Sequence, residues 1–301
     1  MSKEPGKWLT VLDLWRAQRE GSAGLAHRQE TRLAALVAHA REQSRFYRQL
    51  YCHLPAEGTV PSDLPPVTKR ELMASFDDWV TDPRVTLAGV EAFVADPNLI
   101  GTPYCGEFFV CTSAGTTGHP GLFVYDRRTV DVFRAISIAR IMPLWVGARG
   151  LLRLTRRGFQ WAAVVGTGGH YAGAGWMELE RRRSRWLSHA YRVFTVRQSL
   201  AELVGALDAF DPAIVTAYPS ALELLAEEQL AGRLSLRPVF VEIAGESTTR
   251  DACARASVAF GCPIHNVYAA SEFLLMAFSC PHDWLHLNSD WAMLEPVDED
   301  L

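Results

Sequence analysis

Residues 239–268, VFVEIAGESTTRDACARASVAFGCPIHNVY, contain the pattern that decides the fold. The segment opens with the apolar run Val239–Ile243 and closes with a similar run, Ile264–Tyr268, both typical of buried strands. Between them, Thr248 and Asp251 have the spacing of a helix cap, and a glycine follows the helical stretch. A strand, a helix and a strand with short connections predict a parallel pair, the basic unit of an α/β fold.

The same alternation extends toward the N-terminus. We predict strands at Trp161–Val165 and Ile214–Ala217, a helix at Thr129–Ile141, and a further helix capped by Ser220 with Glu223. These elements predict the fold class α/β, with helices layered on a sheet whose strands pair largely in parallel.

The first part of the chain lacks this alternation. Apolar residues at helical spacing predict an amphipathic helix over residues 30–43. Thr68 and Glu71 form the capping box of another helix. We therefore divide the chain into a helical segment, residues 1–100, and an α/β core, residues 101–301.

Residues 112–120, TSAGTTGHP, form a polar loop of hydroxyl side chains, glycines and backbone amides. Such groups can converge on an anion, and a nucleotide phosphate is the foremost candidate. Strand-like runs flank the loop, Phe108–Cys111 before it and Leu122–Tyr125 after it. A Walker-type loop has Gly-Lys-Ser/Thr and opens into a helix, so the GTPase and kinase classes are excluded. A plain surface turn is the alternative.

Two further polar turns, Ala244–Ser247 and Tyr268–Glu272, follow consecutive predicted strands. Because the carboxyl ends of parallel strands meet at one edge of a sheet, we expect the two turns to lie side by side, where α/β sheets bind ligands. A carboxylate next to a polyanionic nucleotide needs a cation between them. Glu272 is therefore a predicted Mg²⁺ ligand.

The loop and the turns resemble the motifs of the adenylate-forming superfamily, which includes acyl- and aryl-CoA ligases, luciferases and adenylation domains. The resemblance is strongest to the phenylacetate–CoA ligase branch and its F390-synthetase-like relatives. Ser113–Pro120 follows that branch's phosphate loop, with His119 where many members carry Lys. Tyr268–Glu272 follows its Tyr-Gly-x-Thr/Ser-Glu motif, with Ala269 in place of glycine. The resemblance implies the layered α/β/α large N-terminal domain of these enzymes, with mixed, largely parallel sheets and without the C-terminal lid domain.

The resemblance also implies roles for individual residues. The phosphates of ATP would be held by Thr112, Ser113, Gly115, Thr116, Thr117 and Gly118. The adenine would lie against Gly245, Glu246, Ser247 and Tyr268, with Ser271 at the α-phosphate and Glu272 on Mg²⁺. Thr116 and Glu272 are the predicted catalytic residues. ATP and Mg²⁺ are the predicted cofactors, and coenzyme A or an amine is the implied acceptor of a second step.

A third segment, Gly168–Ala174, resembles the stretch that borders the acid-binding pocket in this family. The resemblance implies substrate contacts from His170 and Tyr171, and Tyr218 aligns with a turn on the same pocket. A buried structural histidine is an equal alternative for His170.

Cys280, His282 and His286 could bind zinc. Their spacing matches no zinc finger or ribbon, and packing of Cys280 and His286 in a β-hairpin is the alternative; both stay open. Leu285–Leu294 is predicted to form paired strands.

The composition narrows the partners. A formal charge of −4 gives no basic field, so nucleic acid is not expected. The most apolar run, Ala135–Ala148, is interrupted by Arg140 and Pro143, so no membrane span is expected. Six cysteines without a paired framework favour a reducing compartment, and we expect a cytoplasmic protein. The oligomeric state stays open, a homodimer included.

Together these observations predict an AMP-forming acid ligase. A small aryl or acyl carboxylic acid attacks the α-phosphorus of ATP, and the acyl-adenylate is then transferred to coenzyme A or another acceptor. The family's catalytic lysine lies in the missing lid domain, so residues 1–301 alone are expected to be weakly active or inactive. A non-catalytic or zinc-stabilised binding protein of the same fold is the alternative.

Overall fold

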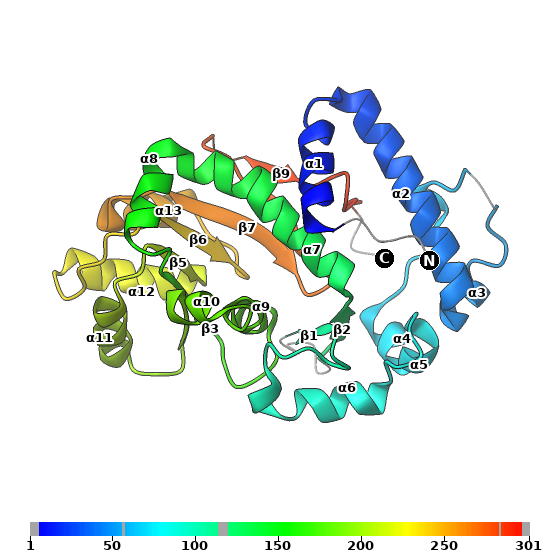
Figure 1. Ribbon diagram of the computed structural model, residues 1–301, viewed down its shortest axis with the longest axis horizontal. Helices are drawn as coiled ribbons and strands as arrows, with labels where there is room; N and C mark the ends of the chain where they lie inside the picture. The colour runs from blue at the N-terminus through cyan, green and yellow to red at the C-terminus, as the bar shows by residue number, and fades with distance from the viewer. Residues whose placement is uncertain (1–5, 56–57, 114–119, 283, 297–301) are drawn as a thin grey trace.

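A computed structural model describes residues 6–55, 58–113, 120–282 and 284–296. A seven-stranded sheet with helices on both faces forms one part of the molecule, and a group of N-terminal helices lies beside it (Figure 1).

The strands of the large sheet are β3 (Trp161–Val165), β4 (Tyr191–Thr195), β5 (Ile214–Ala217), β6 (Phe240–Ala244), β7 (Ile264–Ala270), β8 (Phe273–Ser279) and β9 (Leu285–Leu287). Their order is β4-β3-β5-β6-β7-β8-β9. The pairs from β4 to β7 are parallel, and β8 and β9 add an antiparallel edge. The predicted fold class, α/β with a mixed and largely parallel sheet, is confirmed.

Helices cover both faces of the sheet, as the apolar strands require. One face packs against α11 (Leu200–Phe210), α12 (Pro219–Leu230) and α13 (Arg250–Phe260). The other face packs against α7 (Arg127–Ile136), the π-helical segment Ser137–Ile141, α8 (Met142–Arg156) and α9 (Ala172–Arg181). α10 (Arg185–Ala190) leads into β4. Val164 and Val241, on central strands, are fully buried.

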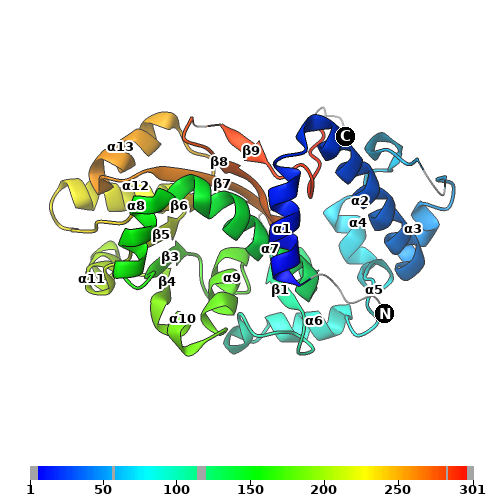
Figure 2. The ribbon, with the colours of Figure 1, turned by 45° about the horizontal axis from the view of Figure 1, so that its top comes forward.

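The described residues before the first strand form only helices and turns: α1 (Lys7–Ala17), α2 (Gly21–Gln43), α3 (Arg45–Leu50), α4 (Lys69–Ala74), α5 (Phe76–Trp79), α6 (Leu87–Val94) and two 3₁₀ turns, Pro61–Asp63 and Pro97–Leu99. α1 packs against α7, and it lies between the sheet and the other N-terminal helices (Figure 2). The predicted capping box is confirmed, because the Glu71 N–H donates to Thr68 Oγ1 at 3.3 Å and the Thr68 N–H donates to Glu71 Oε2 at 2.7 Å.

Ion pairs fix α2 to the segment that follows β9. Asp290 is 4% exposed. It accepts from Arg140 Nη1 at 2.7 Å and from Arg32 Nη1 at 3.2 Å. Burial would raise the pKa of Asp290, but the bonds from the two arginines outweigh it and the pKa is lowered. Asp290 is therefore an ionised group whose pairing links three distant parts of the chain.

A separate two-stranded antiparallel sheet holds the ends of the polar loop. β1 (Phe109–Thr112) and β2 (Leu122–Tyr125) pair in the register Thr112 with Leu122. The predicted strand–loop–strand arrangement is confirmed, with the first strand displaced by one residue.

Three local predictions are wrong. α13 is capped by Thr249, whose side chain accepts from the Ala252 N–H, because Thr249 and not Thr248 is the last extended residue before the helix. α12 begins at Pro219, whose fixed φ suits the first helical position, so Ser220 is already inside the helix. The predicted strand pair within Leu285–Leu294 does not form, because β9 pairs with the strand before it, β8.

Arg127–Arg156 is a 30-residue helical stretch that is long and apolar enough to cross a membrane, by length and composition. Gly147 interrupts the stretch with a φ of 59° and a ψ of 177°, and Arg140 within it pairs with Asp290.

Candidate functional site

The turn between β7 and β8 contacts the strands that carry the polar loop. The Ser271 carbonyl accepts a hydrogen bond from the Tyr125 hydroxyl on β2 and one from Cys111 Sγ on β1, the latter at 3.9 Å. Tyr125 and Ser271 are 146 positions apart in the sequence. The base of the loop therefore lies at the carboxyl edge of the large sheet, as the sequence predicted for a ligand site.

Hydrogen bonds close the base of the loop. The Ser113 N–H donates to the Gly121 carbonyl at 3.0 Å, and the Gly121 N–H donates to Ser113 Oγ at 2.7 Å. The Thr112 N–H donates to the His170 carbonyl at 2.8 Å, which joins the loop to the segment before α9. The other predicted phosphate contacts, Gly115, Thr116, Thr117 and Gly118, lie outside the described residues, as does His119.

Lys69 is a cation at this base that no sequence motif indicated. A Cβ built on Gly121 would lie 3.0 Å from Lys69 Cδ. Lys69 opens α4 directly after the cap residue Thr68, so the capping box fixes where its side chain starts. The sequence did show a lysine directly after a strong helix cap. The polar loop is about 50 residues away in the chain, so the sequence alone could not predict that the two lie close together.

The turn after β6 packs against Tyr218. Gly245 has a φ of +87°, a conformation that favours glycine. A Cβ there would also lie 3.1 Å from Tyr218 Cε1. The Tyr218 hydroxyl accepts from the Gly166 N–H at 3.3 Å, and the Tyr171 ring borders the same glycine. Gly245, predicted at the adenine, and Tyr218 and Tyr171, predicted at the acid, thus form one cluster.

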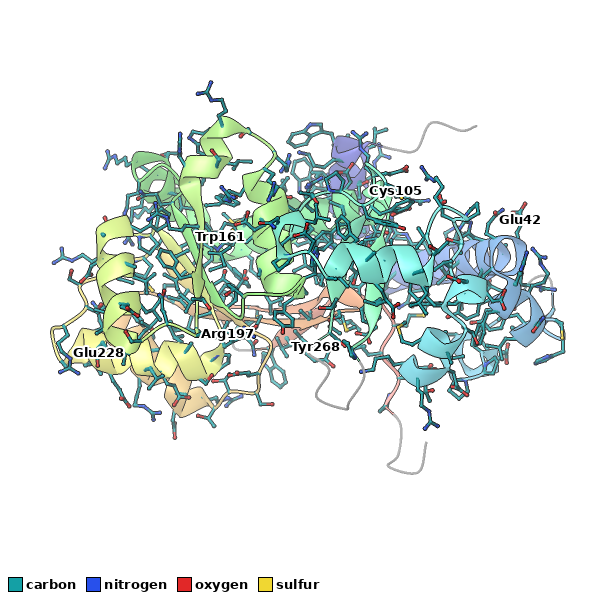
Figure 3. The ribbon with its side chains drawn as sticks, turned by 90° about the horizontal axis from the view of Figure 1, so that it is seen from below. Glu42, Cys105, Trp161, Arg197, Glu228 and Tyr268 are labelled. Atoms are coloured by element: carbon teal, nitrogen blue, oxygen red, sulfur yellow. The ribbon has the colours of Figure 1, made fainter. Side chains whose placement is uncertain are left out.

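Glu246 binds the start of a helix. Its Oε2 accepts from the Ser220 N–H at 3.1 Å, so this carboxylate supplies the cap that Ser220 was predicted to provide. Ser247 is exposed, and Tyr268 is 49% exposed. Figure 3 shows Tyr268 and Arg197 along the same side of the molecule, where β7 and β4 end.

Glu272 is exposed and forms no ion pair with the residues that the structure describes. The negative charge of Glu272 nevertheless affects pKa values at the base of the loop. Burial raises the pKa of Cys111 to about 12, and the Glu272 carboxylate contributes to that rise. Burial also raises the pKa of Tyr125, with Cys111 and Glu272 adding to it. A carboxylate near the loop and without a fixed cation has the chemistry of a Mg²⁺ ligand.

His170 is 1% exposed. Its Nε2 lies 3.1 Å from the Asp96 carbonyl, and its ring packs on Phe93 with the centroids 5.2 Å apart. Burial lowers the pKa of His170. These contacts favour the structural alternative for this side chain, while its backbone carbonyl holds Thr112.

The residues predicted as zinc ligands lie near the end of the sheet opposite the Ser271 turn, since β8 runs from that turn toward Cys280. The His282 N–H donates to Cys280 Sγ at 3.4 Å, and the His286 ring stacks on Phe278. Across the described ranges, no three His, Cys, Asp or Glu side chains are grouped to hold a metal ion. The three residues instead line a cavity of about 610 Å³ together with Arg140. These contacts favour packing in the hairpin.

The fold is similar to that of solved structures of 2-hydroxyisobutyryl-CoA ligase. A complex with 2-HIB-AMP and CoA in the thioesterification state has a TM-score of 0.56 and 21% identity, over 88% of this chain and 53% of that one. An open conformation with the same ligands gives 0.55 and 20%, over 86% and 52%. The chain thus spans about half the length of these ligases. No protein-family model and no curated protein sequence matches it. At this identity the likeness establishes the fold.

Proposed function

We propose that this chain is the nucleotide- and acid-binding part of an AMP-forming acid ligase. It binds ATP and a small carboxylic acid and forms the acyl-adenylate, and coenzyme A or an amine accepts the acyl group. Within the adenylate-forming superfamily we place it near the phenylacetate–CoA ligase branch, on the motifs of its loop and turns. The six free thiols support a cytoplasmic location.

One observation carries the proposal. The strands that flank the polar loop bind the Ser271 carbonyl, so a hydroxyl- and glycine-rich loop starts beside the residue before Glu272. A loop of anion-binding groups and an unpaired carboxylate are a poor combination in a structural turn. They suit a triphosphate with a divalent cation.

The residues of this chain act by holding and orienting the reactants. Thr112, Ser113, Thr116 and Thr117, with the loop amides, bind the β- and γ-phosphates, and Lys69 supplies a positive charge near the base of the loop. Mg²⁺, when bound to Glu272, neutralises phosphate charge. Such chemistry depends mainly on positioning and on charge stabilisation.

Two side chains and two turns fix the remaining parts of ATP and the acid. The adenine lies against Gly245 to Ser247 and Tyr268, and the Ser271 hydroxyl contacts the α-phosphate. Tyr218 and Tyr171 border the acid, so that its carboxylate faces the α-phosphorus opposite the departing pyrophosphate. Bringing the two reactants together in line is itself a large part of the rate enhancement.

Calorimetric titration with ATP and Mg²⁺ tests the proposal. We expect binding that requires Mg²⁺, and loss of most of the affinity in Thr116→Val and in Glu272→Gln. Glu272 is exposed, so the melting temperature of nucleotide-free Glu272→Gln should barely change. Absence of Mg²⁺-dependent ATP binding by the parent chain would refute the proposal.

A non-catalytic binding protein of this fold is the second candidate. His119 in place of Lys and Ala269 in place of glycine favour it. Acid-dependent exchange of pyrophosphate into ATP by this chain would exclude it.

A further inference from the structure

A row of polar side chains crosses the apolar face of the large sheet. Trp161 on β3 donates from Nε1 to Thr216 Oγ1 on β5 at 2.8 Å, and Thr216 Oγ1 donates to Glu242 Oε1 on β6 at 3.2 Å. Thr216 and Glu242 are direct register partners in the parallel pair. All three belong to the face covered by α7, α8 and α9, where most neighbouring residues are apolar. His265 on β7 is the second register partner of Glu242.

The hydrogen bonds of the row are directional. The indole N–H can only donate, so it occupies an acceptor position on the threonine hydroxyl and leaves the hydroxyl proton for Glu242. Among the described residues, the second oxygen of Glu242 has no partner and the carboxyl has no ion pair. Burial raises the pKa of Glu242 to about 7. Glu242 is partly exposed, so this second oxygen is available to an incoming hydrogen-bond donor.

Glu242 lies on the strand that leads to the candidate site. Glu242 stands three residues before Gly245, which is about 10 Å along an extended strand, and Thr216 stands two residues before Tyr218. On this face Thr216, Glu242 and Ala244 are partly exposed, whereas Val215, Val241 and Ile243 on the opposite face are buried. The covering layer is thus incomplete above Glu242, on the side where Tyr218 and Gly245 meet.

We propose that Glu242 is the specificity-determining residue of the acid site and that it selects carboxylic acids carrying an amino or hydroxyl group at the end remote from the carboxylate. The inference rests on the proposed function. The body of such an acid lies against the apolar side chains of this face, among them Trp161 and Ala244. Its carboxylate faces the Ser271 turn, and its remote N–H or O–H donates to the free oxygen of Glu242. The separation of Glu242 from Gly245 suits an aromatic ring substituted at both ends.

Matched acids test the assignment: benzoate against 4-aminobenzoate and 4-hydroxybenzoate, and pentanoate against 5-hydroxypentanoate. Each is titrated calorimetrically into the chain with and without ATP and Mg²⁺. We expect at least one donor-bearing acid to bind about tenfold or more tightly than its parent, the scale of a hydrogen bond to a charged or buried acceptor. Glu242→Gln keeps the side-chain shape and should abolish this preference. Glu223→Gln, on exposed α12, should keep it.

Thr216→Val is the second variant, because it removes the hydroxyl that orients Glu242 and should reduce the preference without creating a cavity. Equal binding of donor-bearing and parent acids, no binding of any acid, or a preference that survives in Glu242→Gln would overturn the inference. ATP binding separates the two proposals. If ATP binds and the acid preference is absent, only the role of Glu242 fails; if ATP does not bind, the proposed function fails, and the titrations without nucleotide still decide the role of Glu242.

Discussion

Replacing Glu242 by glutamine removes an interior carboxyl but keeps the length of the side chain and an acceptor for Thr216. In the folded chain the pKa of Glu242 is about 7, raised from 4.5 by burial and lowered again in part by the Thr216 hydrogen bond. A carboxyl with a raised pKa favours folding when it is protonated. Its contribution is complete below about pH 4.5 and is lost as the pH rises through 7.

The size of the effect follows from the two pKa values. Each tenfold change in proton affinity corresponds to about 1.4 kcal/mol. Between pH 5 and pH 8, proton linkage then removes roughly 2–3 kcal/mol of unfolding free energy from the parent chain that the glutamine variant does not lose. That is a large part of the total stability of a typical domain.

Urea denaturation at several pH values between 5 and 8 measures this difference. The quantity of interest is the unfolding free energy of the parent minus that of Glu242→Gln, since titrating groups far from Glu242 contribute to both and cancel. We expect the difference to fall by roughly 2–3 kcal/mol over this range. Glu223→Gln serves as the surface control and should run parallel to the parent. A difference that stays constant with pH would show that the Glu242 carboxyl is not in an interior environment, and the reasoning would fail.

Three further changes test other contacts. Gly245→Ala should cost about 1 kcal/mol more than Gly232→Ala in a denaturation experiment, because both positions have positive φ but only the former meets the Tyr218 ring; equal costs would contradict that contact. Asp290→Asn should cost about 3 kcal/mol at pH 7, because it leaves buried arginine charge without its partner, and the loss should shrink as the pH falls below 4; a loss under 0.5 kcal/mol would show the pairing to be unimportant. Lys69→Met should weaken ATP binding about tenfold with an unchanged melting temperature, and unchanged affinity would remove Lys69 from the site.

Local chemistry explains why most of the fold could be predicted. The strands β3, β5, β6 and β7 are short apolar runs between turn residues, and each was found within about two residues of its end. β8 was not predicted, because Phe273–Ser279 begins directly after the polar turn and its apolar residues do not alternate with polar ones. Its identity as a strand depends on pairing with β7, a tertiary contact that periodicity alone does not reveal.

The candidate site was predictable to the extent that its residues follow strands. The turns Ala244–Ser247 and Tyr268–Glu272 belong to consecutive parallel strands, so the topology alone put them at one edge. The attachment of the polar loop to Ser271 was different. It depends on Tyr125 and Cys111, apolar-looking strand residues whose polar atoms meet the turn only after the small sheet has docked.

Glu242 shows most clearly what a motif search overlooks. In the sequence it is the single charged residue of an otherwise apolar strand, VFVEIA. Strand alternation predicts which face of the sheet Glu242 lies on, but it does not predict its hydrogen-bond partner. Only the register with Thr216, and the tryptophan behind that threonine, make it a carboxyl with one oxygen bound and one available. A carboxyl inside a sheet costs stability unless its hydrogen-bonding positions are filled, and a ligand that donates to the available oxygen of Glu242 would fill the position that Thr216 leaves open.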